Sequence, residues 1–456
     1  MEQYVEIRRK IKEKKIEFVQ LEAIDLCGTI KCLFMNSESF IYGLPSNFHM
    51  GSPSMLMLPD GKGVDGTGLT FEINNPNAKL APELETFKSL PWLQNTASIF
   101  CDLDIDHIEY FQTSCRQQCK KQLRKMEALG YRFFSSFEYE FYLVDKDTLK
   151  PVYEESNWYS EEHIDRIRPF IQDVMSYLQK TGIQVEAFTS EDGPAQQELT
   201  MKPTFGIQAS DNAMLFKKAV KSSAQKHHMK ALFMTQPFED HSHCSSHFNH
   251  SIWQLSKKEN AFSQINKDDK LSDICKYWIA GLQHHSKALP ALYWATNNCV
   301  EKCLAKDSQD SYFVPSNNTW GYDHRGVRFR IKNYSPSCTY IEDRLPGAGC
   351  NPYLVTTGCL IAGMDGINRK LPLKSEAFFG NILEAAGLPL GAEKVPESLE
   401  KAIEYLKEDQ VFVNELGDVF MKAFTALKTA EFQRWDGIQN VEERFAMYRQ
   451  KYGMYL

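Results

Sequence analysis

The sequence lacks the features that would place a protein in a membrane or on nucleic acid. None of its 456 residues belongs to an apolar run near the roughly 20 residues that a membrane-spanning helix needs. The segment MEQYVEIRRKIKEKKIEF is charged throughout and has no apolar signal-peptide core. The net charge is -7, so the basic surface that binds nucleic acid is also missing. We therefore expect a cytoplasmic protein that binds neither membranes nor nucleic acid.

A cysteine framework is missing as well. The twelve cysteines are scattered without the tight spacing of a disulfide scaffold. In a reducing compartment they are expected to be free thiols. Cys115 and Cys119 are four residues apart on an expected helix and would share a face, for which two ordinary buried thiols are the simplest interpretation.

What the chain does contain is an ordinary globular composition, with 43% hydrophobic and 24% charged residues. A first unit of about 105 residues is predicted to be rich in strands, and the chain after Asp104 alternates strands with long helices. The first unit has a helix at 2–15, strands at 18–25, 30–34, 84–92 and 97–103, and a loop at 43–68. Beyond it we expect a strand at 131–144 and helices at 113–129, 161–181, 209–230, 271–291 (ended by Pro290) and 397–433. This pattern predicts an α+β protein.

Two glutamates suggest half of a metal site. Glu138 and Glu140 are two apart on the expected strand, so both carboxylates face the same side. Their neighbours are large and apolar, and burying two like charges costs several kcal/mol unless a cation pairs them. Oxygen ligands on one face suit a hard metal ion. For this pair alone, a solvated strand face is the simpler alternative.

Four further ligand-type residues follow in order along the chain. Glu191 and Glu198 flank a Gly-Pro turn that can fold both toward one point, and Glu342 comes later. His247 adds a ligand suited to Mn²⁺ as well as Mg²⁺. The histidine-rich run around it offers an alternative zinc site, made of His241, His243, His247 and His250 with Cys244.

Basic residues accompany the carboxylates. Arg344 is two residues past Glu342 on the same strand face, and Arg325, Arg328 and Arg330 are predicted to line another strand. Arginines beside a metal-binding carboxylate cluster suit the phosphates of ATP or a substrate carboxylate. The alternative for each arginine alone is a surface ion pair.

Two longer motifs carry a family resemblance. Ile341-Glu-Asp-Arg-Leu-Pro-Gly-Ala-Gly-Cys-Asn-Pro-Tyr-Leu354 and Ala362-Gly-Met-Asp-Gly-Ile367 resemble the signature of type I glutamine synthetases, and the likeness runs from about residue 15 to the C-terminus. It implies a β-grasp domain at 1–107 and a catalytic domain at 108–456 with a curved antiparallel sheet and helices. It also implies two hexameric rings stacked into a dodecamer, and sites that use ATP with two Mg²⁺ or Mn²⁺ ions.

The resemblance assigns roles to the candidate site residues. Glu140, Glu191 and Glu198 would bind the first cation. Glu138, His247 and Glu342 would bind the second. Arg325, Arg330 and Arg344 match the phosphate- and substrate-binding arginines of the family.

The family pattern is broken at several loops. Ser242-His-Cys-Ser245 replaces a glycine-rich loop, and its larger side chains are expected to crowd the pocket. Asn249 replaces a second histidine, and Phe48-His-Met-Gly-Ser52 stands where the family binds ammonium. A flap that carries an arginine and a catalytic glutamate is about seven residues shorter between Tyr312 and Arg325, so that water would compete for the reactive acyl phosphate.

Glu85-Thr-Phe-Lys-Ser-Leu-Pro-Trp92 and Thr319-Trp-Gly-Tyr322 further resemble the lengsins, a vertebrate lens branch of the family. That likeness implies a structural or chaperone-like protein on intermediate filaments, such as vimentin filaments, in lens fibre cells. The missing loops favour a loss of glutamine synthesis, and no catalytic residue is assigned. Because all six metal ligands remain, the alternative is an ATP- and Mg²⁺-dependent glutamate–amine or glutamate–ammonia ligase.

Overall fold

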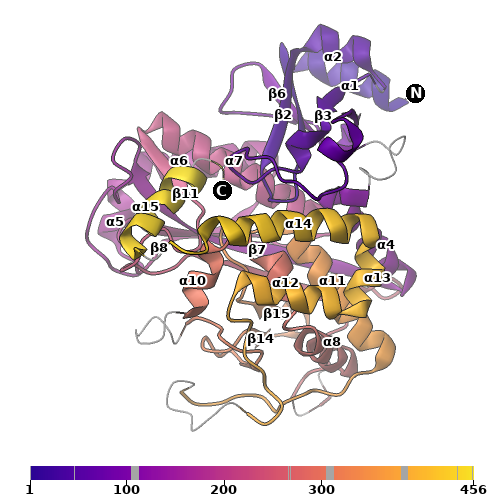
Figure 1. Cartoon of the computed structure of the whole chain (residues 1–456), viewed down its shortest axis with the longest axis vertical. Helices are drawn as coiled ribbons and strands as arrows, with labels where there is room; N and C mark the ends of the chain where they lie inside the picture. The colour runs from indigo at the N-terminus through magenta and orange to yellow at the C-terminus, as the bar shows by residue number, and fades with distance from the viewer. Residues whose placement is uncertain are drawn as a thin grey trace.

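A computed structural model describes residues 2–455 apart from 46, 104–111, 265, 268, 305–312, 382–388, 439 and 454. In these residues the chain forms two sheets with helices packed around them (Figure 1). The expected junction at 107/108 lies outside the described residues. None of the helices described is both long and apolar enough to cross a membrane.

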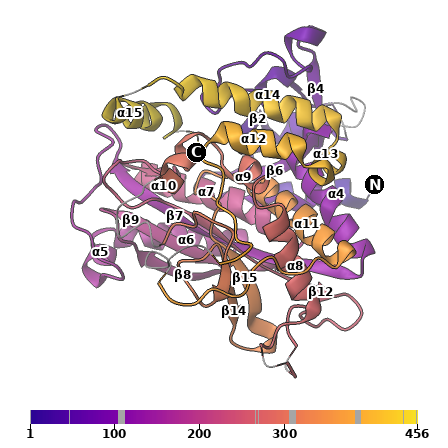
Figure 2. The same cartoon turned by 60° about the horizontal axis from the view of Figure 1, so that its bottom comes forward.

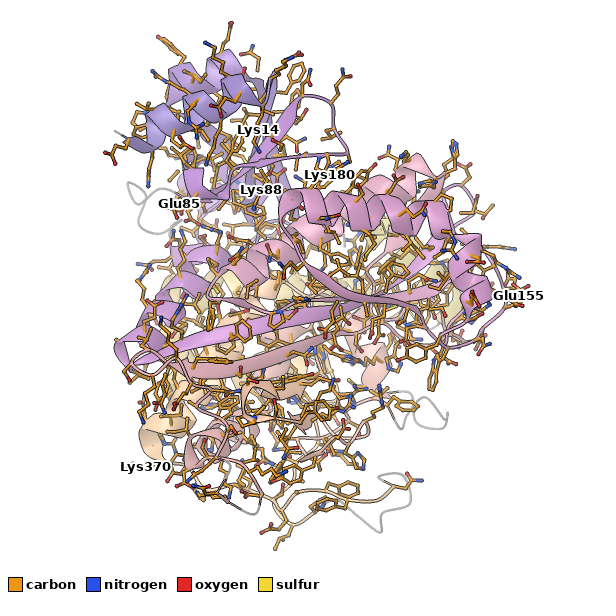
Figure 3. The ribbon with its side chains drawn as sticks, turned by 180° about the vertical axis from the view of Figure 1, so that it is seen from behind. Lys14, Glu85, Lys88, Glu155, Lys180 and Lys370 are labelled. Carbon is orange, nitrogen blue, oxygen red and sulfur yellow. The ribbon has the colours of Figure 1, made fainter. Side chains whose placement is uncertain are left out.

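The N-terminal sheet has six strands in the order β2-β1-β6-β4-β3, with β5 paired to β6. β1 (Phe18–Ile24) and β2 (Ile30–Asn36) form a hairpin, and β1 runs parallel to β6 (Thr96–Leu103). The remaining elements are α1 (Glu2–Glu13), α2 (Ser37–Gly43), β3 (His49–Gly51), β4 (Asn77–Pro82) and β5 (Lys88–Ser89). The expected loop at 43–68 thus contains a short strand. Figure 3 shows Lys14, Lys88 and Lys180 where this sheet faces the rest of the chain.

The second sheet has nine strands in the order β13-β14-β15-β12-β7-β9-β8, with β10 and β11 also paired to β7. All of its pairs are antiparallel except β13–β14. Its strands are β7 (Tyr131–Asp145), β8 (Val185–Ser190), β9 (Gln196–Met201), β10 (Thr204–Phe205), β11 (Met229–Leu232), β12 (Ser246–Gln254), β13 (Trp320–Tyr322), β14 (Phe329–Asn333) and β15 (Thr339–Asp343). This sheet agrees with the expected α+β architecture.

Helices cover one face of this sheet (Figure 2). Successive side chains of a strand point to opposite faces, so on β7 the aromatic residues turn one way and the glutamates the other. Tyr139 stacks on Phe216 of α7 (Gln208–Lys226) at 5.3 Å, and Phe137 and Phe141 are fully buried beside it. The packing of the helices therefore fixes which face of the sheet remains open.

Glycines bring two of the helices unusually close. A Cβ atom on Gly281 of α8 (Asp273–His284) would lie 2.1 Å from the carbonyl oxygen of Ala362. A Cβ on Gly366 of α11 (Pro352–Arg369) would lie 2.1 Å from the carbonyl oxygen of Tyr277. The Gly-Met-Asp-Gly part of the second motif therefore has a packing role.

Several predicted helices are wrong in their extent. The helix expected at 161–181 is two helices, α5 (Glu161–Arg166) and α6 (Arg168–Thr181), because Pro169 begins a new helix after Ile167. The helix expected at 209–230 ends at Lys226, and β11 follows it. Pro290 does not end a helix but lies in the first turn of α9 (Leu289–Tyr293).

The helix expected at 397–433 is three helices: α12 (Leu399–Glu408), α13 (Gln410–Leu416) and α14 (Asp418–Trp435). Asp409 caps α13 by accepting hydrogen bonds from the amides of Val411 and Phe412, and Gly417 has φ +87° between the last two helices. The structure also contains α4 (Cys115–Ala128), as expected, and α10 (Asn298–Leu304) and α15 (Val441–Tyr452), which were not predicted. All twelve cysteines are free thiols.

Candidate functional site

The register of the central strands brings the predicted ligands together. His247 on β12 lies opposite Glu138 on β7, and Glu140 lies opposite Glu198 on β9. Glu342 on β15 lies opposite Arg330 on β14. Since these strands are neighbours, residues from five distant parts of the sequence share the open face of one sheet.

That face forms the floor of a cavity of ≈ 540 Å³. The nine residues predicted for the site all line it: Glu138, Glu140, Glu191, Glu198, His247, Arg325, Arg330, Glu342 and Arg344. A second cavity of ≈ 400 Å³ meets the first at Glu138 and Tyr340. Together they offer an elongated space along the sheet.

His247 is central among the carboxylates. Its Nδ1 lies 3.5 Å from Glu138 Oε2 and 3.6 Å from Glu342 Oε1, and its Nε2 lies 3.8 Å from Glu140 Oε1. One ligand atom each from Glu138, Glu198 and His247 lie within 4.8 Å of one another. The resemblance groups Glu198 with Glu140 and Glu191 as ligands of the first cation. In the structure Glu198 also lies within reach of the ligands of the second cation.

One half of the site has its negative charge balanced by the protein. Glu342 Oε2 lies 3.1 Å from Arg330 Nη1 and 3.0 Å from Lys332 Nζ, and Glu342 Oε1 lies 2.6 Å from Arg344 Nη1. Burial alone would raise the pKa of Glu342, but Arg344 and the other nearby cations hold it well below its usual range. The surrounding basic side chains therefore favour the ionised form of this carboxylate.

The other half has an excess of negative charge. Burial, together with the neighbouring Glu140, raises the pKa of Glu191 to about 8. Burial and the surrounding glutamates raise the pKa of Glu198 well above its usual range. No basic side chain among the described residues forms an ion pair with either carboxylate, and a cation bound beside them would favour their ionised forms.

The donor set fits the groups that the resemblance implies. Five carboxylates and one imidazole suit Mg²⁺ or Mn²⁺. Within the described part of the chain, the buried Nε atoms of Arg330 and Arg344 have no hydrogen-bond acceptor. Buried donors of this kind are costly, and phosphate oxygens would satisfy them.

The prediction that three arginines line one strand is wrong. Arg330 belongs to β14, but Arg325 precedes the strand and reaches the cavity from a turn. Arg328 turns away from the cavity, and its Nε lies 3.2 Å from Asp343 Oδ1 in the core. A turn at Arg325 and Gly326 and a bend up to Arg328 precede β14, so the expected period of two does not hold there.

The loop that replaces the family's glycine-rich segment is firmly held. Its Ser245 amide donates to Glu140 Oε2 at 2.9 Å, and its Ser242 hydroxyl donates to Asp192 Oδ2 at 2.6 Å. His243 lines the cavity as expected, but Cys244 is fully buried outside it. The loop therefore narrows the cavity through one side chain.

Asn249, in place of a second histidine, donates to Glu138 Oε1 at 2.8 Å. The zinc alternative is not supported, because His250 faces the opposite side of β12 from His247. There it accepts a hydrogen bond from Trp278 Nε1 at 3.0 Å.

Two lysines, one half-buried and one buried, and an aromatic rim were not predicted from the sequence. Lys332 follows Arg330 by two residues on β14 and could have been found by strand alternation. Lys302 on α10 donates to the Ser245 hydroxyl beneath the cavity, and no sequence pattern points to it. Trp158, Tyr159 and Phe313 line the cavity mouth, with Trp158 and Phe313 in edge-on contact at 5.7 Å between ring centres.

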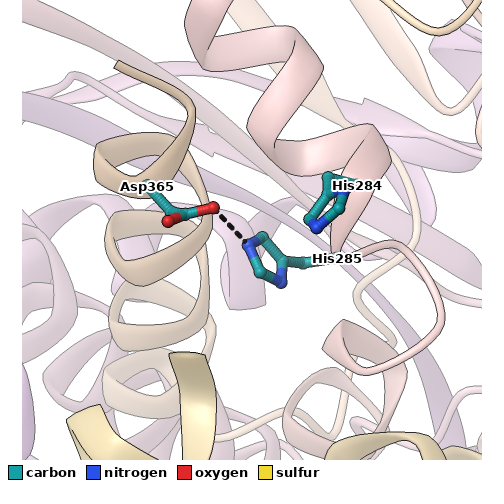
Figure 4. A group of neighbouring side chains, drawn as sticks. All are labelled: His284, His285 and Asp365. Carbon is teal, nitrogen blue, oxygen red and sulfur yellow. Dashed lines mark hydrogen bonds and ion pairs between the residues drawn. The ribbon is translucent and has the colours of Figure 1, made fainter. Parts of the chain in front are cut away.

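A second group of ligand-type residues, His284, His285 and Asp365, lies elsewhere (Figure 4). His285 Nε2 lies 3.0 Å from Asp365 Oδ2, and its Nδ1 lies 2.6 Å from Asp409 Oδ2. Both ring nitrogens are occupied by hydrogen bonds, so this histidine joins three helices and offers no lone pair to a metal.

Comparisons with known proteins agree with this geometry. The family profile "Glutamine synthetase, catalytic domain" matches residues 112–446. Human lengsin is 31% identical over 432 residues, which is 94% of this chain and 82% of that protein. A glutamate–isopropylamine ligase from Pseudomonas sp is 28% identical over 96% of each chain. A solved structure described as a GmaS/ADP complex shares the fold, with a TM-score of 0.84, 23% identity, and coverage of 96% of this chain and 98% of that one.

Proposed function

Because this chain belongs to the glutamine synthetase family, we propose that it is a ligase that uses ATP and divalent cations to join a glutamate-like carboxylate to an amine other than ammonia. The observation that carries the proposal is the convergence of all six ligand residues in one cavity, where Glu191 and Glu198 have no basic ion-pair partner among the described residues. A chain without cation chemistry would gain stability by replacing such carboxylates with neutral residues.

The residues of the cavity have distinct tasks in this proposal. Arg330 and Arg344 would hold phosphate oxygens through their free Nε donors, and Glu342 keeps both guanidinium groups in place. The cations, when bound, would neutralise the phosphate charge. The buried walls would limit the access of water to an activated carboxylate.

The mouth of the cavity supports an amine with an apolar substituent. The rings of Trp158, Tyr159 and Phe313 lie beside the acidic groups of Glu191 and Asp192. Carboxylates attract an ammonium group, and aromatic faces favour both a cation and an attached alkyl or aryl group. Two of the loops at which the sequence departs from the family, the segment 242–245 and the shortened flap with Phe313, line this cavity, which agrees with an acceptor larger than ammonia.

The test is phosphate release by the purified protein with ATP, Mg²⁺ or Mn²⁺, glutamate and a panel of amines. We expect turnover with alkyl- or arylalkylamines above that with ammonia, and a loss of at least about a hundredfold in Glu191→Gln. Glu155→Gln, an exposed position paired with Arg166, serves as the control and should retain activity. Equal rates in wild type and Glu191→Gln with every amine would contradict the proposal.

A second candidate is a lengsin-like structural protein in the cytoplasm that binds intermediate filaments and makes no product. It is favoured by the 31% identity to human lengsin and by the missing glycine-rich loop. Cosedimentation with assembled vimentin separates the two candidates. Binding that is unchanged in Glu191→Gln, in a protein without turnover, would support the structural role.

A further inference from the structure

A third cavity, of ≈ 590 Å³, lies outside the proposed ligase site and shares no lining residue with it. Its walls come from the turn between β1 and β2, the segment around Gly51, one face of α7, and Tyr455 near the C-terminus. The C-terminus lies beside α7 and below the N-terminal sheet in Figure 1. Exposed Cys32 and Tyr455 line the cavity, so it opens to solvent. The cavity thus joins four separate segments of the chain.

Four lysines line this cavity: Lys31, Lys217, Lys218 and Lys221. Two of them have carboxylate partners, since Lys31 Nζ lies 3.2 Å from Asp25 Oδ2 and Lys218 forms an ion pair with Glu22. The positive charge of this pair of lysines is therefore balanced within the protein.

Lys217 and Lys221 are not balanced. Neither forms an ion pair in the described residues, and both instead donate to backbone carbonyls, Lys217 to Cys350 at 3.3 Å and Lys221 to Tyr455 at 3.1 Å. Lys217 is only 6% exposed and also lies over the ring of Tyr139, 4.9 Å from its centre. Two ammonium groups one helical turn apart thus face a cavity in which the described residues provide no anion for either of them.

Holding these charges costs free energy. Burial lowers the pKa of Lys217 to about 8, and burial together with Lys217 lowers the pKa of Lys221 to about 7. Thr29 and Ser54 also line the wall, but their hydroxyls already donate to Asp25 Oδ2 and to the Gly51 carbonyl. A ligand with two or more negative charges would satisfy both lysines.

We propose that this cavity binds a small polyanion, carrying phosphate or several carboxylates, between the β1–β2 turn and α7. The ligand would bridge the N-terminal sheet and the helix layer of the large sheet. It would therefore stabilise the arrangement of these two parts, at a place separate from the ligase site.

The first experiment is acetylation of surface amines by the N-hydroxysuccinimide ester of acetic acid, read by peptide mass spectrometry. The full-length protein is labelled in EDTA at constant ionic strength, with pyrophosphate, citrate or added chloride. We expect saturable protection of Lys217 and Lys221 by one of the two polyanions and none by chloride. Whichever of pyrophosphate and citrate protects better shows whether the cavity prefers a phosphate or a polycarboxylate. Lys226, on the same helix but paired with Asp173 outside the cavity, should label equally in all three.

Calorimetric titration of the protecting anion into two variants completes the test. Lys221→Gln should weaken the affinity about tenfold, because it removes one charge-assisted contact, and Lys226→Gln should leave it unchanged. The proposal is overturned if the polyanions do not protect Lys217 and Lys221 from acetylation, or if they protect Lys226 equally. It is also overturned if the anion binds Lys221→Gln with the same affinity as wild type, which would place the anion at the arginines of the first cavity.

Discussion

At the residue scale, Glu198 is the clearest indicator of cation binding. Burial and the neighbouring carboxylates raise the pKa of Glu198, so its ionised form adds no stability to the metal-free protein. We expect Glu198→Gln to have the same thermal midpoint as wild type, or a slightly higher one, in EDTA. In saturating Mg²⁺ or Mn²⁺, the thermal midpoint of wild type should rise by a few degrees, as expected when cation binding stabilises the folded state by about 2–3 kcal/mol. The midpoint of the variant should not rise.

The control for this comparison is Glu155→Gln, which should gain as much from the cation as wild type. Scanning calorimetry gives both midpoints. A cation response that is equal in wild type and Glu198→Gln would show that the ions bind outside the cavity.

The buried lysines predict a pH dependence of the polyanion site. The folded-state pKa values of Lys217 and Lys221, about 8 and 7, lie below the ordinary lysine value. The folded protein therefore binds fewer protons than the unfolded chain from about pH 7 upward, and this pair adds stability as the pH rises through that window. Lys31, Lys218, Asp25 and Glu22 are the other charged groups around the same cavity.

Anion binding should oppose this effect, because an anion favours the protonated lysines. We expect polyanion affinity to fall as the pH rises from 7 to 9, and binding at pH 8 to take up protons. Calorimetry in two buffers that differ in ionisation enthalpy measures that uptake. Proton release, or an affinity that does not change with pH, would contradict the assignment.

The candidate ligands were predictable residue by residue because strand alternation is local. Glu138 and Glu140 had to share a face, and so did Glu342 and Arg344. The sequence could not reveal that Lys302 lies under Ser245, because only the packing of α10 brings these two residues together. It also could not reveal that Arg328 turns into the core, because the partner that draws it there, Asp343, is defined by the fold.

At the scale of elements, His285 joins α8 to α11 and to the start of α13. It is almost fully buried and lies between two carboxylates, Asp365, which Figure 4 shows, and Asp409. Burial alone would raise the pKa of Asp409, but the hydrogen bond from His285 holds it below its usual value. We expect His285→Gln to cost about 3 kcal/mol, because two carboxylates on different helices lose their shared hydrogen-bond partner.

The matched control is His284→Gln, one residue earlier on the exposed side of the same helix, which should change stability by less than about 0.5 kcal/mol. Urea unfolding followed by circular dichroism provides the comparison. Equal midpoints for the two variants would remove His285 as a link between the helices.

The helix boundaries show where sequence patterns stop being informative. The apolar spacing at 397–433 runs through three helices, because α12 and α14 pack on each other and both need an apolar side. The breaks come from the cap at Asp409 and the left-handed backbone at Gly417, which periodicity does not detect. Met229 and Lys230 were assigned to the preceding helix for a similar reason, since only two residues separate the end of α7 from β11 (Met229–Leu232).

At the scale of the whole molecule, we propose that the first 107 residues form a β-grasp domain and that subunits assemble into rings, up to a dodecamer. The edge of the N-terminal sheet supports assembly. β2 is its outermost strand, and Phe34 on it is 56% exposed and stacked on Phe18. An unpaired edge with exposed aromatic side chains favours contact with another chain.

We expect sedimentation velocity to show a large assembly for wild type and smaller species for Phe34→Glu. Phe379→Glu places the same charge at an exposed phenylalanine of the larger region and should leave the assembly intact. A monomeric wild-type protein would exclude the ring proposal.

The position of β7 has a consequence for how this protein can change. The strand pairs with β9, β10, β11 and β12 and contacts α4 and α7, so Glu138 and Glu140 lie at the most connected part of the fold. A substitution there would disturb several neighbours at once, whereas Trp158, Tyr159 and Phe313 project from the rim. A laboratory selection for activity with new acceptor amines should therefore yield variants substituted at the rim of the cavity. The residues of the cavity floor should be unchanged in all selected variants.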